Sequence, residues 1–552
     1  MKKMTRIAAI AAAMTLAACM AVPAMSFSAS AAGTGSITIS DSTGATHNTL
    51  SAFQIFTADL DAAKDLMVTG WGDGVDVAGL SAAIVADTDL NAAIGALTDD
   101  AAGAKAAAEK ISALSSANAD KLAKLITQNT AGDGTPAGAT SGNTSIDGLD
   151  TGYYIVKDTS AAQKDNYTAY TLGILAVVNG ETTTASPKMD FPSFDKQIGD
   201  INDTTNTAGT YTYDEAADHD IGDDVPFKLI ATVPANIDQY DTYKLIFHDS
   251  LEDGVFTLDT DSVAVKYYGA SDTTGTDVTA AFVQTNPGTE NAAFTNPHGD
   301  KTENLTLTCD DIKAITGIAP AAGGRFEVSY TAKLTDNAKI GAPGNWNSAY
   351  LEYSNNPNVS GSGVTGNTGT SPEDSVVAFT YQAVVNKVDE KNAPLPGAEF
   401  KLEKKLKDGS TVECGCVKAN ADATFVFNGL DDGEYTLTET QTPGSGYVAV
   451  DPITFTITGG EVQTDGSEAI GTPSVSGTDF TAAKVYVLDG TTATEGTEAG
   501  AFDTTIINRK GVTLPTTGGA GTVLFAVVGA ALAAGAGTIM VAKKRAKDEE
   551  EQ

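Results

Sequence analysis

Two kinds of hydrophobic pattern divide the chain. Between Leu80 and Gln128, apolar residues recur at every third or fourth position, which predicts amphipathic helices. Strand-like segments such as residues 36–40 and 152–156 flank this stretch. From Phe191 onward, short segments of alternating apolar and polar residues are separated by Asp, Gly, Asn and Thr, which predicts β-strands joined by turns. We therefore expect a mostly β protein with an α+β N-terminal domain.

The changes of pattern also predict domain boundaries, because the two all-β regions have the strand spacing of tandem immunoglobulin-like β-sandwiches. We expect five segments, in this order: a signal peptide (1–31), an α+β domain (32–187), a β-sandwich (188–380), a smaller β-sandwich (381–511) and a C-terminal segment (512–552).

Both ends of the chain carry transport signals. Lys2, Lys3 and Arg6 precede an apolar stretch that ends in small residues, as in a secretory signal peptide. Near the C-terminus, residues 523–542 carry no charge and are long enough to cross a membrane as a helix. Basic residues follow this run at 543–545 and would stay on the cytoplasmic side. The sequence thus predicts an exported protein that is held at its C-terminus.

Composition excludes several classes of function. The chain carries 71 acidic and 34 basic residues, a net charge of -37, so nucleic acid is not an expected partner. Its four histidines lie far apart, and no metal or cofactor is expected. Strand alternation points His248 away from the apolar face, so a surface histidine is expected there. After the signal peptide only Cys309, Cys414 and Cys416 remain, which is no disulfide framework. Some other device must stabilise the exported domains.

Lysine, acid and asparagine residues occupy inward positions in both predicted sandwiches. Because residues i and i+2 of a strand share a face, each of these residues continues an apolar series. The first sandwich has Lys196, Asp249 and Asn347 in such positions, and the second has Lys387, Glu439 and Asn508. Burying an unpaired charge is very unfavourable, so we expect the members of each trio to meet.

The C-terminal segment resembles the cell-wall sorting signal of Gram-positive surface proteins, which are sortase substrates. The resemblance rests on a five-residue motif before the apolar run and the basic cluster: Leu514, Pro515, Thr516, Thr517 and Gly518. It implies that sortase cuts the bond between Thr517 and Gly518 and passes the acyl group to an amine. The implied location is the cell wall, with peptidoglycan as a partner.

The whole chain resembles the backbone pilins of Gram-positive sortase-assembled pili. Residues 347–357 (NSAYLEYSNNP) are similar to the end of the second domain of these pilins. Residues 435–440 (YTLTET) resemble the E-box of a domain of the CnaB type. In that family a lysine near the first strand and an asparagine on the last strand of each sandwich form an isopeptide bond.

Carried over to this sequence, the resemblance implies two such bonds. They are Lys196–Asn347, assisted by Asp249, and Lys387–Asn508, assisted by Glu439. Asn345 is an alternative partner to Asn347. Burial would lower the pKa of the lysine and raise that of the acid, which leaves a neutral nucleophile beside a proton donor. Each domain would react once, so the chain is not expected to be an enzyme.

The family also has an acceptor lysine, in a Tyr-Pro-Lys motif between the first and second domains. This chain has Ser186-Pro187-Lys188 there, with serine in place of tyrosine. The resemblance implies that Thr517 of one subunit joins Lys188 of a neighbouring subunit, which makes the chain a structural shaft subunit of a covalent pilus. The alternatives are a monomeric wall-anchored adhesin and a minor pilin at the tip or base, and a host glycan or protein ligand is left open.

Overall fold

The computed structural model describes most of the chain between the predicted signal peptide and the sorting motif. The described residues are 34–40, 50–60, 66–140, 143–158, 174–178, 182–185, 190–295, 301–357, 368–459, 474–476 and 479–511. They form two compact units with the main boundary between Thr380 and Tyr381, and the short segment Asp203–Thr205 belongs to the second unit. Strands dominate both units, which confirms the mostly β prediction.

The first unit begins with two sheets and a group of helices. One sheet has the strand order β5-β6-β1-β9, and the other has the order β3-β2-β7-β8 with β4 beside β2. These strands are β1 (Gly35–Ser40), β2 (Leu50–Leu60), β3 (Leu66–Trp71), β4 (Thr135–Pro136), β5 (Gly138–Thr140), β6 (Asn143–Leu149), β7 (Gly152–Asp158), β8 (Ile174–Val178) and β9 (Thr182–Ala185). Ile37, Leu50 and Ile146 pack between the two sheets, and this part is α+β as expected.

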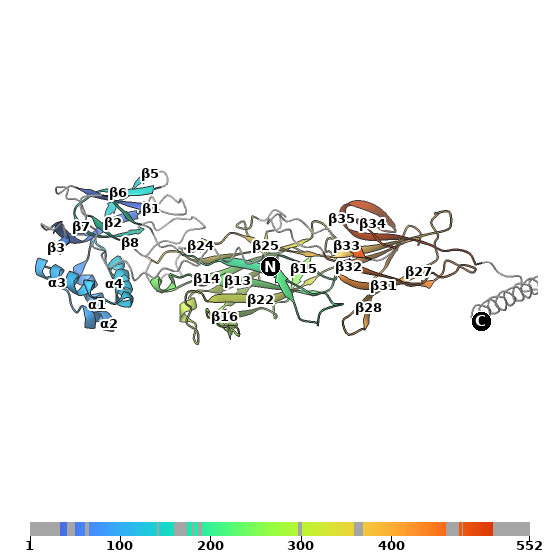
Figure 1. The fold of residues 1–552 in the computed structure, drawn as a ribbon, viewed down its shortest axis with the longest axis horizontal. Helices are drawn as coiled ribbons and strands as arrows, with labels where there is room; N and C mark the ends of the chain where they lie inside the picture. The colour runs from blue at the N-terminus through green and yellow to red at the C-terminus, as the bar shows by residue number, and fades with distance from the viewer. Residues whose placement is uncertain are drawn as a thin grey trace, which may run out of the picture. The chain divides into compact units, whose positions relative to one another are not determined.

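The predicted helical stretch is divided among four helices. They are α1 (Val77–Ala86), α2 (Thr88–Ala93), α3 (Ala101–Ser112) and α4 (Ser116–Gln128). Each begins where a side-chain oxygen of Asp76, Asp87, Asp100 or Ser115 accepts a backbone N–H of its first turn. The helices lie on the side of β2 and β7 opposite β1 and β6, where Leu80, Leu90 and Leu122 pack against Phe53 (Figure 1).

Two seven-stranded sheets form the remainder of the first unit. The first has the order β11-β10-β13-β22-β16-β17, with β15 beside β22. Its strands are β10 (Phe194–Asp200), β11 (Thr212–Asp214), β13 (Asp224–Thr232), β15 (Phe256–Leu258), β16 (Ala264–Tyr268), β17 (Thr276–Asp277) and β22 (Arg325–Leu334).

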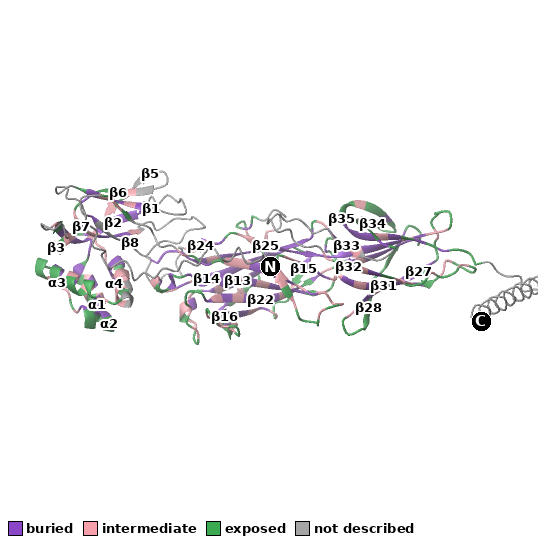
Figure 2. Cartoon of the chain, in the orientation of Figure 1, coloured by how far each residue is buried: buried purple, intermediate pink, exposed green. Residues whose placement is uncertain are grey.

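The second sheet has the order β12-β25-β23-β14-β21-β18, with β24 beside β23. Its strands are β12 (Ala216–Asp218), β14 (Leu245–Leu251), β18 (Val283–Thr285), β21 (Leu305–Cys309), β23 (Asn345–Ser354), β24 (Thr368–Thr370) and β25 (Asp374–Phe379). A separate pair, β19 (Thr289–Glu290) and β20 (Thr302–Glu303), and three short 3-10 helices, η2 (Ile237–Gln239), η3 (Thr279–Ala281) and η4 (Ile312–Ala314), complete this region. Side chains of both sheets form one buried core, and Figure 2 shows buried residues along β13, β14 and β22.

The second unit is a smaller pair of five-stranded sheets. Their orders are β29-β30-β26-β35-β34 and β28-β27-β31-β32-β33. The strands are β26 (Tyr381–Val388), β27 (Glu399–Lys405), β28 (Thr411–Cys414), β29 (Val417–Ala419), β30 (Thr424–Leu430), β31 (Gly433–Gln441), β32 (Ile453–Thr458), β33 (Ser474–Ser476), β34 (Thr481–Asp489) and β35 (Thr492–Ile507). The first strand, β26, pairs in parallel with the last, β35, and places Lys387 opposite Ile506.

Within the described ranges, no helix is both long enough and apolar enough to cross a membrane. The predicted signal peptide (1–31), the sorting motif (514–518) and the apolar run (523–542) all lie outside these ranges.

Candidate functional site: buried lysine, acid and asparagine groups

The first trio lies between the two seven-stranded sheets. Lys196 is on β10 of one sheet, whereas Asp249 on β14 and Asn347 on β23 belong to the other. In the β14–β23 register Asp249 is opposite Ala349 and Leu251 is opposite Asn347. Asp249 and Asn347 are therefore diagonal neighbours on one face. Strand alternation points all three side chains inward, and at most 1% of each is exposed.

Hydrogen bonds join this trio through a fourth residue, Tyr330 on β22. Lys196 Nζ donates to Asp249 Oδ2 (2.5 Å) and to the Tyr330 hydroxyl (3.1 Å). The Tyr330 hydroxyl donates to Asp249 Oδ2 (2.7 Å) and accepts from Asn347 Nδ2 (2.8 Å). The structure thus places the amine, the carboxyl and the amide in one closed polar network inside an apolar core.

Burial sets the charge state of this network. It lowers the pKa of Lys196, although the neighbouring Asp249 acts in the opposite direction. It also raises the pKa of Asp249, against the effect of Lys196. Both shifts favour a neutral amine beside a protonated carboxyl group.

Two buried oxygen atoms of the network support the protonated acid. Neither Asp249 Oδ1 nor Asn347 Oδ1 accepts a hydrogen bond from any described residue. Buried acceptors without a donor are costly. A proton on the Asp249 carboxyl would turn one of these acceptors into a donor.

Asn345 takes no part in the network. Its Oδ1 accepts the backbone N–H of Lys339 (2.8 Å), and its Nδ2 donates to the carbonyl oxygens of Lys339 (3.0 Å) and Ala378 (3.1 Å). The Asn345 amide holds a loop, so the geometry favours Asn347 as the partner of Lys196.

Asn347 does not lie on the last strand of this sandwich. Its strand, β23, is followed by β24 and β25, so the expectation of a last-strand asparagine is wrong here.

The second trio occupies the core of the second unit. Lys387 is at the end of β26, Glu439 is on β31, and Asn508 directly follows β35. Asn508 Nδ2 donates to Glu439 Oε2 (3.0 Å) and to the carbonyl oxygen of Val448 (2.6 Å). Lys387 Nζ donates to the carbonyl oxygen of Ile506 (2.9 Å) instead of to the acid. The structure therefore joins the acid to the amide directly and holds the amine on the neighbouring backbone.

The lysine of the second trio, like that of the first, has a lowered pKa. Burial lowers the pKa of Lys387 to about 8, although the Glu439 charge acts in the opposite direction. Among the described residues, none donates a hydrogen bond to Glu439 Oε1 or Asn508 Oδ1. Both units thus combine a lysine of lowered pKa with an acid oxygen and an amide oxygen that lack donors.

The predicted acceptor, Lys188, and the donor motif at 514–518 lie outside the described residues, so the structure does not place them. Asp190, two residues after Lys188, is described, and its Oδ2 accepts the backbone N–H of Ala235.

The structure overturns the expectation that His248 lies at the surface. Its position pointed away from the apolar face, and we expected a surface histidine. The side chain does lie on the other face of β14, but it is buried: Nδ1 is 2.6 Å from Glu303 Oε1, and the ring stacks on Tyr350 with centroids 4.5 Å apart. The alternation identified the face correctly and did not reveal that this face is covered as well.

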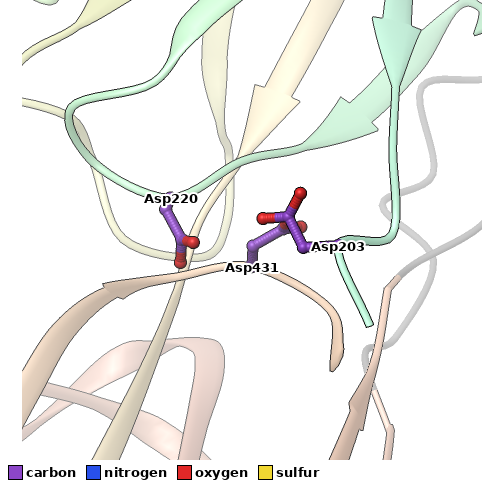
Figure 3. Close-up of side chains that lie close together, drawn as sticks. All are labelled: Asp203, Asp220 and Asp431. Atoms are coloured by element: carbon purple, nitrogen blue, oxygen red, sulfur yellow. The ribbon is translucent and has the colours of Figure 1, made fainter. Parts of the chain in front are cut away.

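Sequence reasoning also missed a buried lysine in the second unit. Lys404 Nζ lies 2.9 Å from Oδ2 of both Asp203 and Asp431. Figure 3 shows the side chains of these two acids, which belong to the same unit as Lys404. Because the two carboxylates already face an ammonium group, this arrangement is a structural ion pair.

Two segments match known protein families. Residues 382–468 match the SpaA family, described as a prealbumin-like fold domain. Residues 508–549 match the LPXTG cell wall anchor motif. The first match agrees with the β-sandwich predicted for this part of the chain, and the second agrees with the predicted sorting signal.

Individual relatives are surface proteins and pilins. The chain is 26% identical over 415 residues to the trypsin-resistant surface T6 protein of Streptococcus pyogenes serotype M6, which covers 66% of this chain and 71% of that protein. Among solved structures, it is similar to the T6 backbone pilin of the same organism (15% identity, TM-score 0.44, 88% of this chain and 95% of that chain). It is also similar to the major pilin SpaD of Corynebacterium diphtheriae (16% identity, TM-score 0.38, 75% of this chain and 88% of that chain).

The relatives are structural proteins rather than enzymes, and the anchor motif indicates a location at the cell wall, as predicted. The family matches and the T6 relative agree with the resemblance seen in the sequence: the chain has a prealbumin-like domain and an LPXTG cell wall anchor motif, and it is similar to a streptococcal surface protein.

Proposed function

We propose that the protein is a shaft subunit of a sortase-polymerised covalent pilus, and that each of its two β-sandwiches forms an internal isopeptide bond. The observation that carries the proposal is the first trio: an amine, a carboxyl and an amide share one buried network with the pKa shifts that the reaction needs.

The bond chemistry follows from this arrangement. Neutral Lys196 Nζ attacks Asn347 Cγ, and the protonated Asp249 carboxyl polarises the amide. The Cγ–Nδ2 bond then breaks, ammonia leaves, and a new amide joins the two side chains. Because folding already holds the reactants together, proximity supplies much of the rate. Lys387, Asn508 and Glu439 take the same roles in the second unit.

Such a bond would stabilise an exported domain without a disulfide. It closes a loop of 347 − 196 = 151 residues in one unit and of 508 − 387 = 121 residues in the other. Tying residues this far apart limits the unfolded chain and is worth about 4 to 5 kcal/mol by analogy with a disulfide. Unlike a disulfide, the bond resists reduction.

Assembly would use the two remaining predicted groups. Sortase would cut after Thr517 and pass the acyl group to Lys188 of the next subunit, or to peptidoglycan at the end of assembly. The partners are therefore sortase, neighbouring copies of this chain and the cell wall. A shaft subunit would form such a covalent polymer, whereas a monomeric adhesin would not.

Intact mass spectrometry of the purified protein tests the internal bonds. Each bond releases one ammonia, about 17 Da, so two bonds reduce the mass by about 34 Da relative to the processed sequence. Peptide mapping then assigns each loss to the 196–347 or the 387–508 pair. A full theoretical mass would reject the isopeptide proposal for both units.

A further inference from the structure

The Tyr330 hydroxyl lies between the groups that must exchange protons in the first sandwich. It contacts Lys196 Nζ (3.1 Å), Asp249 Oδ2 (2.7 Å) and Asn347 Nδ2 (2.8 Å). Within the described structure, no hydrogen bond joins Asp249 to Asn347 directly, so the hydroxyl is the connection between the acid and the departing nitrogen.

In the second unit the acid contacts the amide directly, without a tyrosine between them. There Glu439 Oε2 contacts Asn508 Nδ2 directly at 3.0 Å. Glutamate is one methylene longer than aspartate, so it reaches the amide nitrogen without help. In the first sandwich the shorter Asp249 reaches the same kind of atom only through a phenol.

We propose that Tyr330 is a catalytic residue of isopeptide formation in the first sandwich, where its hydroxyl relays a proton from Asp249 to the departing nitrogen of Asn347. This inference rests on the proposed isopeptide bond between Lys196 and Asn347 and adds a residue to its mechanism.

The relay balances atoms and charge. Attack by neutral Lys196 forms the Nζ–Cγ bond and opens the Cγ–Oδ1 double bond. The proton that Asp249 already carries on Oδ1 passes to Asn347 Oδ1, and a proton of Nζ passes to Asp249 Oδ2. The attacked carbon becomes tetrahedral, so Nδ2 gains a lone pair and can accept a proton. The Tyr330 hydroxyl gives its proton to Nδ2 and takes the proton on Asp249 Oδ2. The Cγ–Nδ2 bond breaks and ammonia leaves. As the Cγ–Oδ1 double bond re-forms, the proton on Asn347 Oδ1 returns to Asp249, and Tyr330 ends as a neutral phenol.

The surroundings suit a neutral phenol that exchanges protons in both directions. Tyr330 is 2% exposed, and its ring stacks on Phe227 with centroids 5.4 Å apart. Packing therefore fixes the ring, while the hydroxyl hydrogen can rotate between Asp249 Oδ2 and Asn347 Nδ2. Burial and the nearby Asp249 raise the pKa of Tyr330 well above its usual value, so the phenol keeps its proton at neutral pH.

The test compares the rates of the two bonds in one molecule. The full chain is synthesised in a short pulse, samples are digested over time, and mass spectrometry measures the loss of ammonia at each pair. Tyr330→Phe should slow formation of the 196–347 bond by about 100-fold, the usual size of a proton-transfer contribution, and leave the rate of the 387–508 bond unchanged.

The matched control is Tyr353→Phe, because Tyr353 is another fully buried tyrosine of this core. Its hydroxyl makes no hydrogen bond to a described residue, and both rates should stay normal.

The outcomes separate the inference from the proposed function. A wild-type chain that never loses ammonia at 196–347 rejects the isopeptide proposal itself. If the wild type forms the 196–347 bond and Tyr330→Phe forms it at the same rate, the relay alone is overturned.

A folding failure of Tyr330→Phe would not end the test, because 3-fluorotyrosine at position 330 keeps the shape of the side chain. Its more acidic phenol is a stronger proton donor, so it should change the 196–347 rate at a fixed pH and leave the 387–508 rate unchanged. An unchanged 196–347 rate would again overturn the relay.

Discussion

Lys387 Nζ lies 2.9 Å from the carbonyl oxygen of Ile506, across the parallel strands β26 and β35. Asn508 is two residues further along, so the amine already lies beside the segment that it would attack. Its hydrogen bonds to the carbonyl oxygens of Ile506 and Val388 must break before the reaction, and the amine must lose its extra proton.

The rate of the 387–508 bond should therefore depend on pH. The pKa of Lys387 is lowered to about 8, so the neutral fraction of the amine rises about tenfold per pH unit below that value and levels off above it. Pulse synthesis followed by incubation between about pH 6 and pH 9 would give this profile from the loss of ammonia. A rate that falls with rising pH over this range would contradict the role of a neutral amine.

Asn508→Ala should remove one covalent tie and destabilise the second unit. We expect a protein about 17 Da heavier than the wild type after allowing for the substitution, and a loss of about 4 to 5 kcal/mol in the free energy of unfolding. Thermal denaturation and intact mass measure the two effects. Lys387→Met should give the same change in mass, and the double variant should be scarcely less stable than either single variant, because only one bond is lost. Additive losses would argue against a shared bond.

Asp249→Asn should fold and fail to react in the first sandwich. The amide has nearly the same size as the carboxyl group, but it cannot accept and return a proton, so the 196–347 peptides should keep their ammonia. Peptide mapping by mass spectrometry checks this result. Asp261→Asn, an exposed acid of the same unit, is the matched control and should leave the bond intact.

Lys188→Arg should abolish polymerisation without affecting the internal bonds. Arginine keeps the positive charge but is not an acylation substrate, so cells should show monomer in place of a high-mass ladder on a denaturing gel. Lys266→Arg, an exposed lysine on β16, should leave the ladder unchanged. A persistent ladder in Lys188→Arg would assign the acceptor role to another lysine, and no ladder in the wild type would favour the monomeric adhesin.

His248 should give the first unit a stability maximum in mildly acidic solution. Burial opposes its charge, but the hydrogen bond to Glu303 and the ion pair with Glu352 outweigh burial and raise its pKa above the usual 6.5. This stabilisation is complete below 6.5 and is lost as pH rises through the raised value. The same contacts lower the pKa of both glutamates below 4.5, so their contribution is present above 4.5 and is lost as pH falls further.

The window of greatest stability thus lies between 4.5 and 6.5. Melting temperatures of the wild type and of His248→Gln, measured across this range and above it, provide the test. The variant should lose about 1 to 3 kcal/mol inside the window and less above it. A pH-independent difference between the two proteins would contradict the ion-pair interpretation.

Alternation along the strands was enough to predict which charged side chains point inward. Lys196, Asp249 and Asn347 each continue an apolar series, and the structure buries all three. Period two determines the face of a strand directly, so this part of the candidate site could be read from the sequence. Whether the buried groups react stays a prediction.

Tyr330 and His248 show where the sequence stops being sufficient. Tyr330 occupies an inward position of β22, where an aromatic residue is ordinary core, and its partner Asp249 is 81 residues away in the other sheet. His248 points outward, and only the fold reveals that Glu303 and Tyr350 cover it. In both cases the role depends on contacts between distant segments, which local patterns do not encode.

The parallel pairing of β26 with β35 also has a mechanical consequence. The ladder between them runs from the pair Gln382–Ala501 to the pair Val388–Ile507. Tension applied before Tyr381 and after Asn508 would pull these two neighbours lengthwise in opposite directions. Without the proposed Lys387–Asn508 bond, their backbone hydrogen bonds would carry the load together in shear, which resists rupture far better than opening them one at a time. Once formed, the covalent bond would bypass this ladder and carry the tension itself.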